Sequence, residues 1–430
     1  MLVHGAAGSG KTTMVSALFD FISRNHSPTL AFKGAATDAG AALIGGVPLT
    51  SIPHSTTMDG GQQYFLIDVA GALDIEILHG LSTQLNLIHD LPTAIFGGKN
   101  VILFADFFQT PPSRNRFNAI WYPNDAHGFL IRPFLSNVSW LQEEPLAVLP
   151  DTTITDKIRL DALCNDDFID LNKHVLNPTD FVTAHASHNF AIVTPSAARC
   201  KQWNNELPIH IATALQETLY ILNASDNVSF SVGATVSIAD LTHLQHNVAN
   251  CGDIPGKMSI YIGMPCSVVI DSTPVWGSVF DIKLDALEDI EFPRPSIVDL
   301  KHPPASVTLK VANELLLHNP DLSPLLQLKP VRRRYEWFLD VDEAVMGYVV
   351  RLQVPIAPRL SMLEKDCDGQ AFEHVLVDTQ SGYQSLRSFY MVASRVRNLD
   401  SLAITHKLFS SADGSWVRSL RQAILQLLYL

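Results

Sequence analysis

Residues 5–12 have the types and the spacing that phosphate binding requires. They read G-A-A-G-S-G-K-T, a complete G-x-x-x-x-G-K-[ST] phosphate-binding loop. A loop that curls around a β-phosphate must bring several backbone N–H groups to the anion, and glycines permit that approach. Lys11 is expected to reach the β- and γ-phosphates, and Thr12 to give its hydroxyl to Mg²⁺. The sequence therefore predicts a protein that binds a nucleoside triphosphate.

The flanking residues predict the strand and the helix that would position this loop. Residues 1–4 suit a short apolar strand, and residues 13–19 have the pattern of an amphipathic helix. A helix that begins near Thr13 would point the positive end of its dipole at the phosphates. The residues expected to bind the nucleotide are Gly5, Gly8, Ser9, Gly10, Lys11, Thr12 and Thr13.

The composition indicates a large globular protein. With 430 residues and 47% hydrophobic content, the chain can bury extensive cores, and its length predicts about two to four domains. No apolar run approaches the roughly 18 residues of a membrane span, and the first residues form a phosphate loop instead of a cleavable signal. We expect an intracellular protein without a membrane segment, in the nucleus or the mitochondrion if its source is eukaryotic.

Cysteine spacing and net charge argue against several kinds of binding site and cross-link. Five cysteines lie far apart without a C-x-x-C pair, which argues against a zinc site or a disulfide framework and predicts reduced, structural cysteines. The net charge of −13 argues against a large exposed nucleic-acid surface but leaves room for a local groove. Basic residues gather in two places, and a solvated face explains such short runs equally well. These residues are Arg332, Arg333, Arg334, Arg387, Arg395, Arg397 and Arg418.

Short apolar runs alternate with helical stretches in two parts of the chain. Buried, non-alternating strands separated by helices are typical of a parallel sheet with helices on both faces. Residues 258–353 differ, because they are rich in proline and in short strand-like runs, and they predict a β-rich insertion. The strands expected in the two α/β parts span residues 29–32, 64–68, 101–106, 190–194, 375–378 and 402–404.

A second motif surrounds the strand predicted at residues 101–106. Residues 97–112 read G-G-K-N-V-I-L-F-A-D-F-F-Q-T-P-P. A Gln at the carboxyl end of a buried strand can hydrogen-bond a γ-phosphate or its attacking water. The string resembles G-G-K-x-V-I-x-x-G-D-x-x-Q-L-P-P of the Pif (petite integration frequency) DNA helicases, with Ala105 for Gly and Thr110 for Leu. These are superfamily-one motors that move 5′ to 3′, and they include the helicases of Helitron-type transposons.

Further blocks follow in the family's order, so the resemblance covers nearly the whole chain. Residues 37–51 resemble a segment that contacts single-stranded DNA in relatives, with departures at Asp38, Pro48 and Thr50. Residues 190–205 resemble the start of the second motor domain, and residues 254–265 resemble the lead into its inserted subdomain. Residues 390–397 read Y-M-V-A-S-R-V-R, close to the family's Y-V-A-L-S-R-x-R.

The resemblance implies an α/β fold with two RecA-like P-loop NTPase domains, each a parallel sheet flanked by helices. The expected boundaries are residues 1–148 for the first motor domain, 149–257 for the start of the second, 258–352 for a β-rich insertion and 353–430 for the completion of the second. It also implies ATP and Mg²⁺ as cofactors, and single-stranded DNA or DNA junctions as partners. The oligomeric state stays open.

Individual roles follow from the same resemblance. Asp68 would hold Mg²⁺ through water beside Thr12, and Gln109 would contact the γ-phosphate. Arg395 would be an arginine finger for the triphosphate. Arg159 stands where relatives carry another γ-phosphate contact, although a surface arginine on a helix would look the same. The catalytic set expected is Lys11, Asp68, Gln109, Arg395 and Arg159.

One departure affects the water-activating group. The family has a strand that ends in Asp-Glu, whereas this chain has Asp68 followed by Val69. A general base contributes about 10²- to 10⁴-fold to a rate, and valine accepts no proton. Nucleotide binding is expected to survive while hydrolysis falls steeply. Asp74 and Glu76 lie on the next predicted helix, and we expect them to restore only a fraction of the rate.

Two other departures concern coupling to DNA and the choice of nucleotide base. Cys367 and Asp368 stand where relatives have a Ser-Gln pair that couples ATP to DNA, and Gly369 is kept. A carboxylate at that position opposes phosphate contacts. The segment in which relatives carry an adenine-reading Gln is expected to be missing before Met1.

The leading hypothesis is an ATP-dependent 5′-to-3′ DNA helicase with the roles that such proteins have in DNA repair, recombination and telomere maintenance. The alternative is a degenerate, transposon-derived relative that binds ATP and DNA without hydrolysis. A signalling or kinase-type P-loop NTPase is disfavoured, because the strings at residues 97–112 and 390–397 have no role there.

Overall fold

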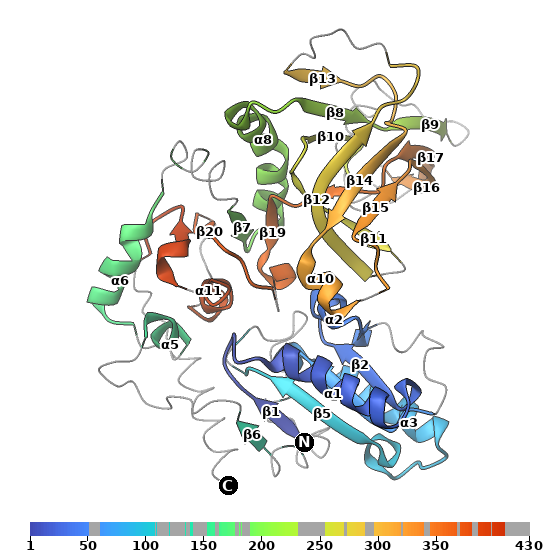
Figure 1. Cartoon of the computed structure of the whole chain (residues 1–430), viewed down its shortest axis with the longest axis vertical. Helices are drawn as coiled ribbons and strands as arrows, with labels where there is room; N and C mark the ends of the chain where they lie inside the picture. The colour runs from blue at the N-terminus through green and yellow to red at the C-terminus, as the bar shows by residue number, and fades with distance from the viewer. Residues whose placement is uncertain are drawn as a thin grey trace. The chain divides into compact units, whose positions relative to one another are not determined.

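A computed structural model of the chain divides into two compact units (Figure 1). The first unit comprises Met1–Pro178, Phe190–Ala197 and Met362–Leu430, and the second comprises Thr179–Asn189 and Ala198–Ser361. The structure describes residues 1–50, 61–107, 109, 120, 134, 138–140, 153–159, 163–176, 180, 182, 190–230, 254–270, 273–288, 296–319, 321–338, 345–367, 370–380, 386–396 and 398–408.

A six-stranded sheet with the order β3-β2-β4-β5-β1-β6 organises the N-terminal part of the first unit. Each pair of neighbouring strands is parallel, so all the carboxyl ends lie along one edge of the sheet. The strands are β1 (Leu2–His4), β2 (Ala31–Ala35), β3 (Val47–Pro48), β4 (Tyr64–Asp68), β5 (Asn100–Ala105) and β6 (Val138–Trp140).

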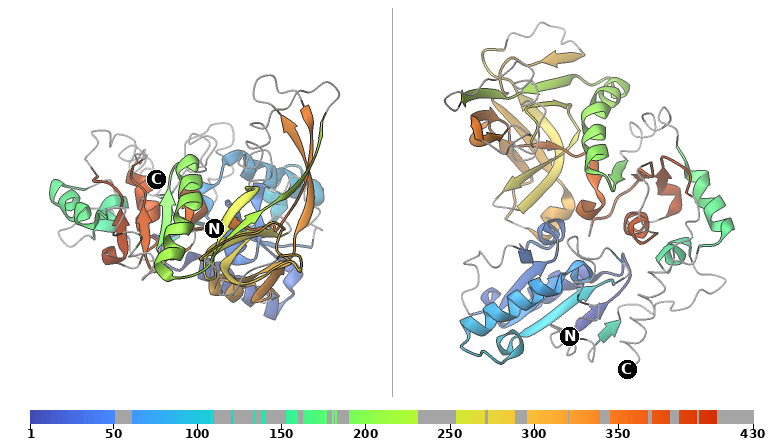
Figure 2. Two further views of the ribbon diagram at one scale, coloured as in Figure 1. Left: turned by 90° about the horizontal axis from the view of Figure 1, so that it is seen from above. Right: turned by 180° about the vertical axis from the view of Figure 1, so that it is seen from behind.

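Helices cover both faces of this sheet. Helix α1 (Lys11–Asn25) lies in front of the strands in Figure 1, and α3 (Ile75–Ile88) lies in front in the rear view of Figure 2. Strand β4 explains the two layers, because Phe65 and Ile67 pack in the core that contains α3, while Leu66 packs in the core that contains Val15 of α1. Strand residues alternate between faces, so a continuous apolar run serves both cores.

A four-stranded sheet with the order β19-β7-β20-β21 forms the rest of the first unit. Its β7-β20 and β20-β21 pairs are parallel, and its core includes side chains of α5 and α11. The strands predicted at residues 190–194, 375–378 and 402–404 are confirmed. The elements of this part are α5 (Ile154–Arg159), α6 (Asn165–Leu171), β7 (Ala191–Thr194), β19 (Ser361–Leu363), β20 (Val375–Val377), α11 (Leu386–Ala393) and β21 (Leu402–Ile404).

The second unit is mostly β structure. Its sheets have the orders β10-β8-β13, β15-β14-β12-β11-β18 and β16-β17-β9. The strands are β8 (Leu219–Asn223), β9 (Ser225–Phe230), β10 (Lys257–Ile260), β11 (Pro265–Ile270), β12 (Thr273–Lys283), β13 (Ile297–Asp299), β14 (Ser306–Val311), β15 (Leu325–Leu328), β16 (Val331–Phe338), β17 (Val345–Gln353) and β18 (Ala357–Pro358). Two helices, α8 (Ala197–Leu215) and α10 (Asn313–His318), accompany them.

A buried ion pair holds two distant strands of the second unit together. Arg351 of β17 is fully buried, and its Nε and Nη2 atoms donate to the two carboxylate oxygens of Asp226 on β9 at 2.7 and 2.6 Å. Paired geometry of this kind offsets the desolvation that a buried guanidinium would otherwise suffer. Strand β9 lies ahead of residue 258, so β structure of this unit begins before the segment predicted as the insertion.

Four of the five cysteines lie among the described residues, and two of these four are buried. Among the described residues, Cys164, Cys200, Cys266 and Cys367 are all free thiols, and Cys251 lies outside this set. Burial raises the pKa of the Cys266 thiol to about 12, which keeps it protonated and unreactive. No helix in the described part of the chain is long and apolar enough to cross a membrane.

Candidate nucleotide-binding site

The phosphate-binding loop connects β1 to α1. The Gly5 N–H donates to the Ala105 carbonyl of β5 at 3.2 Å, which ties the start of the loop to the sheet. Gly8 and Gly10 have φ values of 77° and 87°, which residues that carry a Cβ atom rarely adopt. The helix begins at Lys11 and not near Thr13 as predicted, because Gly10 makes the left-handed turn directly before it. Thr13 therefore lies in the first helical turn.

Lys11 closes the loop on itself. Its ammonium donates to the carbonyl oxygens of Gly5 and Ala6 at 2.6 and 2.8 Å. The hydroxyl oxygen of Ser9 is buried and has no hydrogen-bond partner in the described part of the chain. Buried polar atoms normally have partners, so the loop offers an unsatisfied hydroxyl and an ammonium to an arriving anion. These groups fit a phosphate.

Thr12 and Asp68 meet at the carboxyl edge of the first sheet. The Thr12 hydroxyl donates to Oδ2 of Asp68 at 2.8 Å, and Asp68 is 2% exposed at the end of β4. A hydroxyl and a carboxylate are hard oxygen ligands of the kind that Mg²⁺ accepts, and Mg²⁺ keeps several waters beside such groups. No cluster of three or more metal-ligating side chains occurs among the residues described.

Gln109 lies near the same edge of the sheet. It follows β5, the neighbour of both β4 and β1. Gln109 is 9% exposed, and its backbone N–H donates to the Asp106 carbonyl at 3.1 Å, which forms a turn directly after the strand. The remaining residues of this motif, Phe108, Thr110, Pro111 and Pro112, lie outside the described residues.

Val69 adopts a conformation that is unusual for a β-branched residue. Its φ and ψ are 54° and 30°, in the left-handed region, which costs an L-residue about 1–2 kcal/mol. Its N–H donates to Oδ1 of Asp68 at 2.9 Å. A Cβ added to Gly40 of α2 (Asp38–Ile44) would lie 2.8 Å from a Val69 methyl carbon. An apolar residue with a strained backbone thus stands directly beside the proposed metal-binding carboxylate. Asp74 directly precedes α3, and its carboxylate accepts from the Glu76 N–H in the first helical turn at 2.9 Å.

The second sheet contributes α11 and the residues that follow it. Arg395 is 7% exposed, and its Nε donates to the Met391 carbonyl of α11 at 3.0 Å. Arg159 is the last residue of α5, and its side chain lies outside what the structure describes. The roles of Arg395 and Arg159 therefore stay predictions.

The segment before β20 contains Cys367, one of the two residues that depart from the expected coupling motif. Cys367 is fully buried in the core of the second sheet, and its thiol donates to the Glu364 carbonyl at 2.9 Å. The hydrogen bond of this thiol therefore lies inside the core. Asp368 and Gly369 lie outside the described residues. In the predicted DNA segment, the Thr37 hydroxyl accepts from the Gly40 N–H at 3.1 Å and caps α2.

Sequence reasoning missed Tyr390. Its hydroxyl accepts from the Ala7 N–H of the phosphate-binding loop at 3.3 Å and donates to Oδ2 of Asp106 at 3.2 Å. Tyr390 is 1% exposed on α11. The tyrosine lies within the string at residues 390–397, but no local pattern indicates which backbone N–H a distant hydroxyl will contact.

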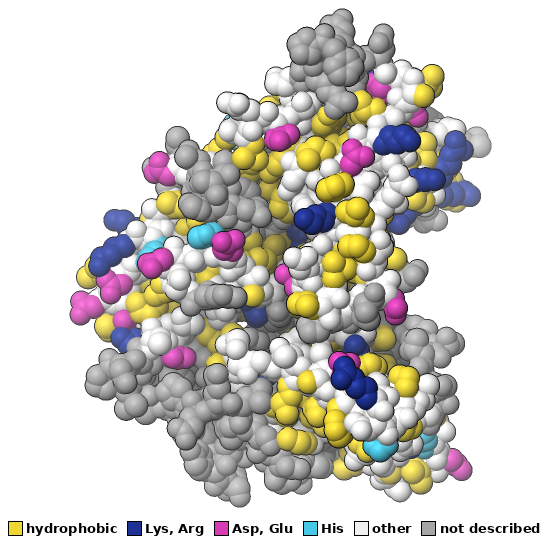
Figure 3. All heavy atoms as spheres, in the orientation of Figure 1, with side chains coloured by type: hydrophobic (Ala, Val, Ile, Leu, Met, Phe, Trp, Pro, Cys, Tyr) yellow, Lys and Arg dark blue, Asp and Glu magenta, His cyan; other side chains and the backbone are white. Residues whose placement is uncertain are grey.

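The arginine run at residues 332–334 lies on β16, an edge strand of the second unit. All three side chains are exposed, and the Arg334 guanidinium lies 3.8 Å from the centre of the Tyr348 ring. Figure 3 shows Lys and Arg side chains gathered over the part that contains β16 and β17. Charged side chains on an edge strand prevent strand pairing with other chains, which agrees with a solvated face. Arg397 and Arg418, and the side chain of Arg387, lie outside the described set.

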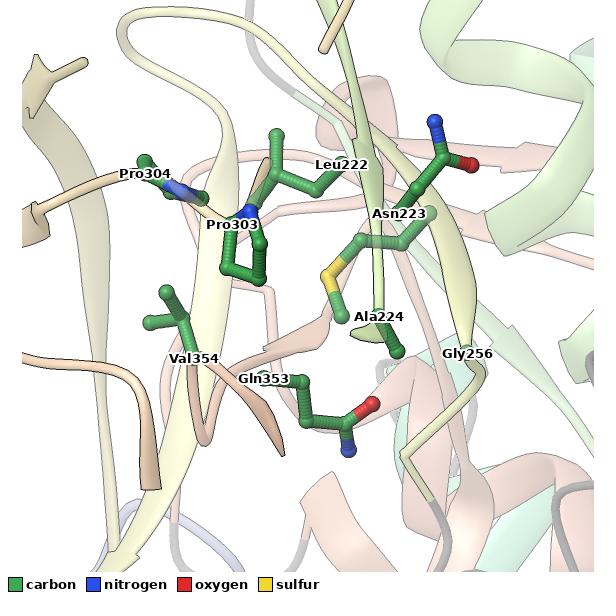
Figure 4. A pocket seen from close by; sticks show the side chains of 9 residues that line it. Leu222, Asn223, Ala224, Gly256, Pro303, Pro304, Gln353 and Val354 are labelled. Carbon is green, nitrogen blue, oxygen red and sulfur yellow. The ribbon is translucent and has the colours of Figure 1, made fainter. Parts of the chain in front are cut away.

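A hollow in the second unit is a poor candidate for a ligand site. It encloses about 210 Å³ including its open mouth, less than the roughly 300–1,000 Å³ of typical small-molecule pockets. Figure 4 shows the rings of Pro303 and Pro304 beside it and the amide of Gln353 at its base. That amide is buried without a protein partner among the residues described, which suits an ordered water.

Solved structures of Pif1 helicases are similar to this chain over nearly its whole length. Pif1 helicase from Candida albicans is 16% identical, with a TM-score of 0.64 and coverage of 99% of this chain and 95% of that chain. Bacteroides Pif1 bound to ssDNA is 15% identical, with a TM-score of 0.61 and coverage of 98% and 93%. Pif1 helicase from Bacteroides in complex with ADP-AlF3 and ssDNA is 15% identical, with a TM-score of 0.61 and coverage of 98% and 92%.

Neither a protein-family profile nor a curated protein matches the chain. The structural similarity nevertheless extends through both parallel sheets and the β-rich second unit, in agreement with the α/β fold predicted from the sequence. The chain therefore has the fold of the Pif1 helicases, with RecA-like parallel sheets flanked by helices, along nearly its whole length.

Proposed function

We propose that this chain is an ATP-binding DNA motor of the Pif type, which couples ATP hydrolysis to 5′-to-3′ movement on single-stranded DNA. The observation that carries the proposal is the hydrogen bond between Thr12 and Asp68, which joins the phosphate-binding loop to a buried carboxylate at the end of β4, two strands away from β1 in the sheet. Gln109 follows β5 near the same edge. Similar structures were solved with ADP-AlF3 and ssDNA, which supports these two ligand classes.

The side chains would act as follows when the triphosphate binds. Lys11 exchanges the two loop carbonyls for oxygens of the β- and γ-phosphates. Thr12 and Asp68 would hold Mg²⁺ together with water, and the bound ion would supply positive charge beside the phosphates. Gln109 contacts the γ-phosphate or its attacking water, and Arg395 stabilises the charge that develops as the phosphate leaves.

A second candidate function is binding of ATP and DNA without hydrolysis. Val69 favours it, because an apolar side chain occupies the position after Asp68 where a proton acceptor is needed. The buried thiol of Cys367 favours it as well, since its hydrogen bond lies within the core of the second sheet. In this case the chain would bind DNA in response to ATP and would act as an interaction module.

ATP turnover with and without single-stranded DNA separates the two functions. We expect the wild type to turn over slowly and Val69→Glu to gain about 10²- to 10⁴-fold, the usual contribution of a general base. Val69→Gln is the matched control, because a glutamine side chain has the size and hydrogen-bonding reach of glutamate but accepts no proton near neutral pH. If DNA stimulates turnover in Val69→Glu but not in wild type or Val69→Gln, the chain is a motor that lacks its general base.

Other outcomes are equally informative. If both glutamate and glutamine variants stay silent while ATP and DNA still bind, the non-hydrolysing function is favoured. If the wild type already turns over faster with DNA, Val69 is no obstacle and the chain is a working motor. Unwinding of partial duplexes with a 5′ or a 3′ single-stranded tail then tests the direction, and preference for the 3′ tail would contradict the proposal.

A further inference from the structure

Tyr390 connects three parts of the first unit that are far apart in sequence. Its hydroxyl has one donor and two acceptor positions. It accepts from the Ala7 N–H of the phosphate-binding loop at 3.3 Å and donates to Oδ2 of Asp106 at 3.2 Å. Both partners lie at the carboxyl edge of the first sheet, whereas Tyr390 belongs to α11 and to the core of the second sheet.

The partners of this hydroxyl are elements of the proposed chemistry. Ala7 belongs to the loop that would enclose the phosphates. Asp106 accepts the Gln109 backbone N–H at its carbonyl, so the carboxylate that holds Tyr390 belongs to the turn that positions Gln109. A hydrogen bond to a carboxylate is stronger than one between neutral groups, and Asp106 is only 2% exposed. Water therefore competes weakly for this contact.

The ring of Tyr390 is fixed on its other side. Tyr390 is 1% exposed within the core that includes Phe389, Val193 and Val377. The backbone continues from Tyr390 through the Ser394 N–H, which donates to the Tyr390 carbonyl at 2.9 Å, to Arg395. The position of the hydroxyl thus sets the position of the helix end that leads to Arg395.

We propose that Tyr390 is a positioning residue: its hydroxyl sets the end of α11 against the phosphate-binding loop, so that Arg395 can reach the transferring phosphoryl group. The inference rests on the proposed function, because it assumes that a nucleotide binds to the loop. It predicts that the hydroxyl matters for the transition state and not for ground-state binding of the nucleotide. A merely structural tyrosine would affect both equally or neither.

The test compares Tyr390→Phe with wild type for the affinities of ADP and of ADP–aluminium fluoride, a transition-state analogue. We expect ADP affinity to change less than about twofold and affinity for the analogue to fall about tenfold or more, as for loss of one hydrogen bond to a charged group. Tyr261→Phe is the matched control, because Tyr261 is equally well buried, at 2% exposure, but belongs to the second unit and not to the unit that contains the loop. It should change neither affinity.

The possible outcomes separate this inference from the proposed function. Equal losses for both ligands, or no loss for either, would overturn the positioning role even if turnover is stimulated by DNA. Absence of DNA-stimulated turnover in both wild type and Val69→Glu would count against the motor, while a selective loss for the analogue would still support Tyr390. If Tyr390→Phe fails to fold, Asp106→Asn removes the charged acceptor and should give the same selective loss, only smaller.

Discussion

The edge of the first sheet that would hold phosphate and metal differs sharply from the residues that would complete hydrolysis. Lys11, Thr12 and Asp68 form short polar contacts with the loop and with each other. One residue further on, Val69 places methyl groups against Gly40, and Cys367 donates its thiol within a core. Under the proposed function, nucleotide binding would depend mainly on the first set of side chains and the rate of hydrolysis also on residues beyond it, so a chain could keep the first set while the second changes.

The largest expected effect concerns Arg395. In whichever of wild type and Val69→Glu turns over ATP, we expect Arg395→Ala to lower turnover about 10³- to 10⁵-fold, as for loss of an arginine finger. Arg24→Ala is the control, because Arg24 is an exposed arginine paired with Asp20 on α1. Steady-state turnover measures the effect. Unchanged turnover in Arg395→Ala would place this arginine on the binding side of the comparison or outside the site.

A smaller effect is expected for the phosphate-binding side. Lys11→Ala should weaken ATP binding about 10- to 100-fold, because it removes charge-assisted hydrogen bonds worth roughly 1.5–3 kcal/mol. Lys33→Ala is the control. Lys33 is a lysine of β2 whose ammonium lies 4.3 Å from the centre of the Phe19 ring, and burial lowers its pKa. Calorimetry with ATP and Mg²⁺ measures the affinities, and equal losses in both variants would argue against a specific phosphate contact.

The smallest effect is expected for Cys367. Added to Val69→Glu, Cys367→Ser should change DNA-stimulated turnover less than twofold, because the side chain is fully buried in the second core. The free energy of unfolding should fall by about 1 kcal/mol, since a hydroxyl that keeps its carbonyl partner is buried at modest cost. Chemical denaturation and turnover assays check both values. A large gain in DNA stimulation would show that this position takes part in coupling after all.

Local sequence patterns predicted the parts of the fold that depend on local burial. The run at residues 64–68 is β4 itself, because an apolar segment ending in Asp68 fits a buried strand that opens onto a site. The strand predicted at residues 29–32 begins instead at Ala31, since Pro28 starts a short 3₁₀ helix capped by Ser27. Strand β9 was not predicted, because its polar residues become a strand only through pairing with β17, more than a hundred residues away.

The candidate site shows the same division. The loop, Asp68 and Gln109 could be selected as candidates because each belongs to a short sequence motif. The left-handed backbone of Val69 and the contacts of Tyr390 could not, because each depends on what another segment places beside the residue.

The internal contacts of Lys11 have a consequence for how a nucleotide enters. The ammonium already has two carbonyl partners in the loop, at 2.6 and 2.8 Å, so the loop is curled before any anion arrives. Binding is then an exchange of partners, and the measured affinity is a difference between two sets of hydrogen bonds. A change that weakened these internal contacts while leaving the backbone N–H groups of the loop in place would strengthen nucleotide binding.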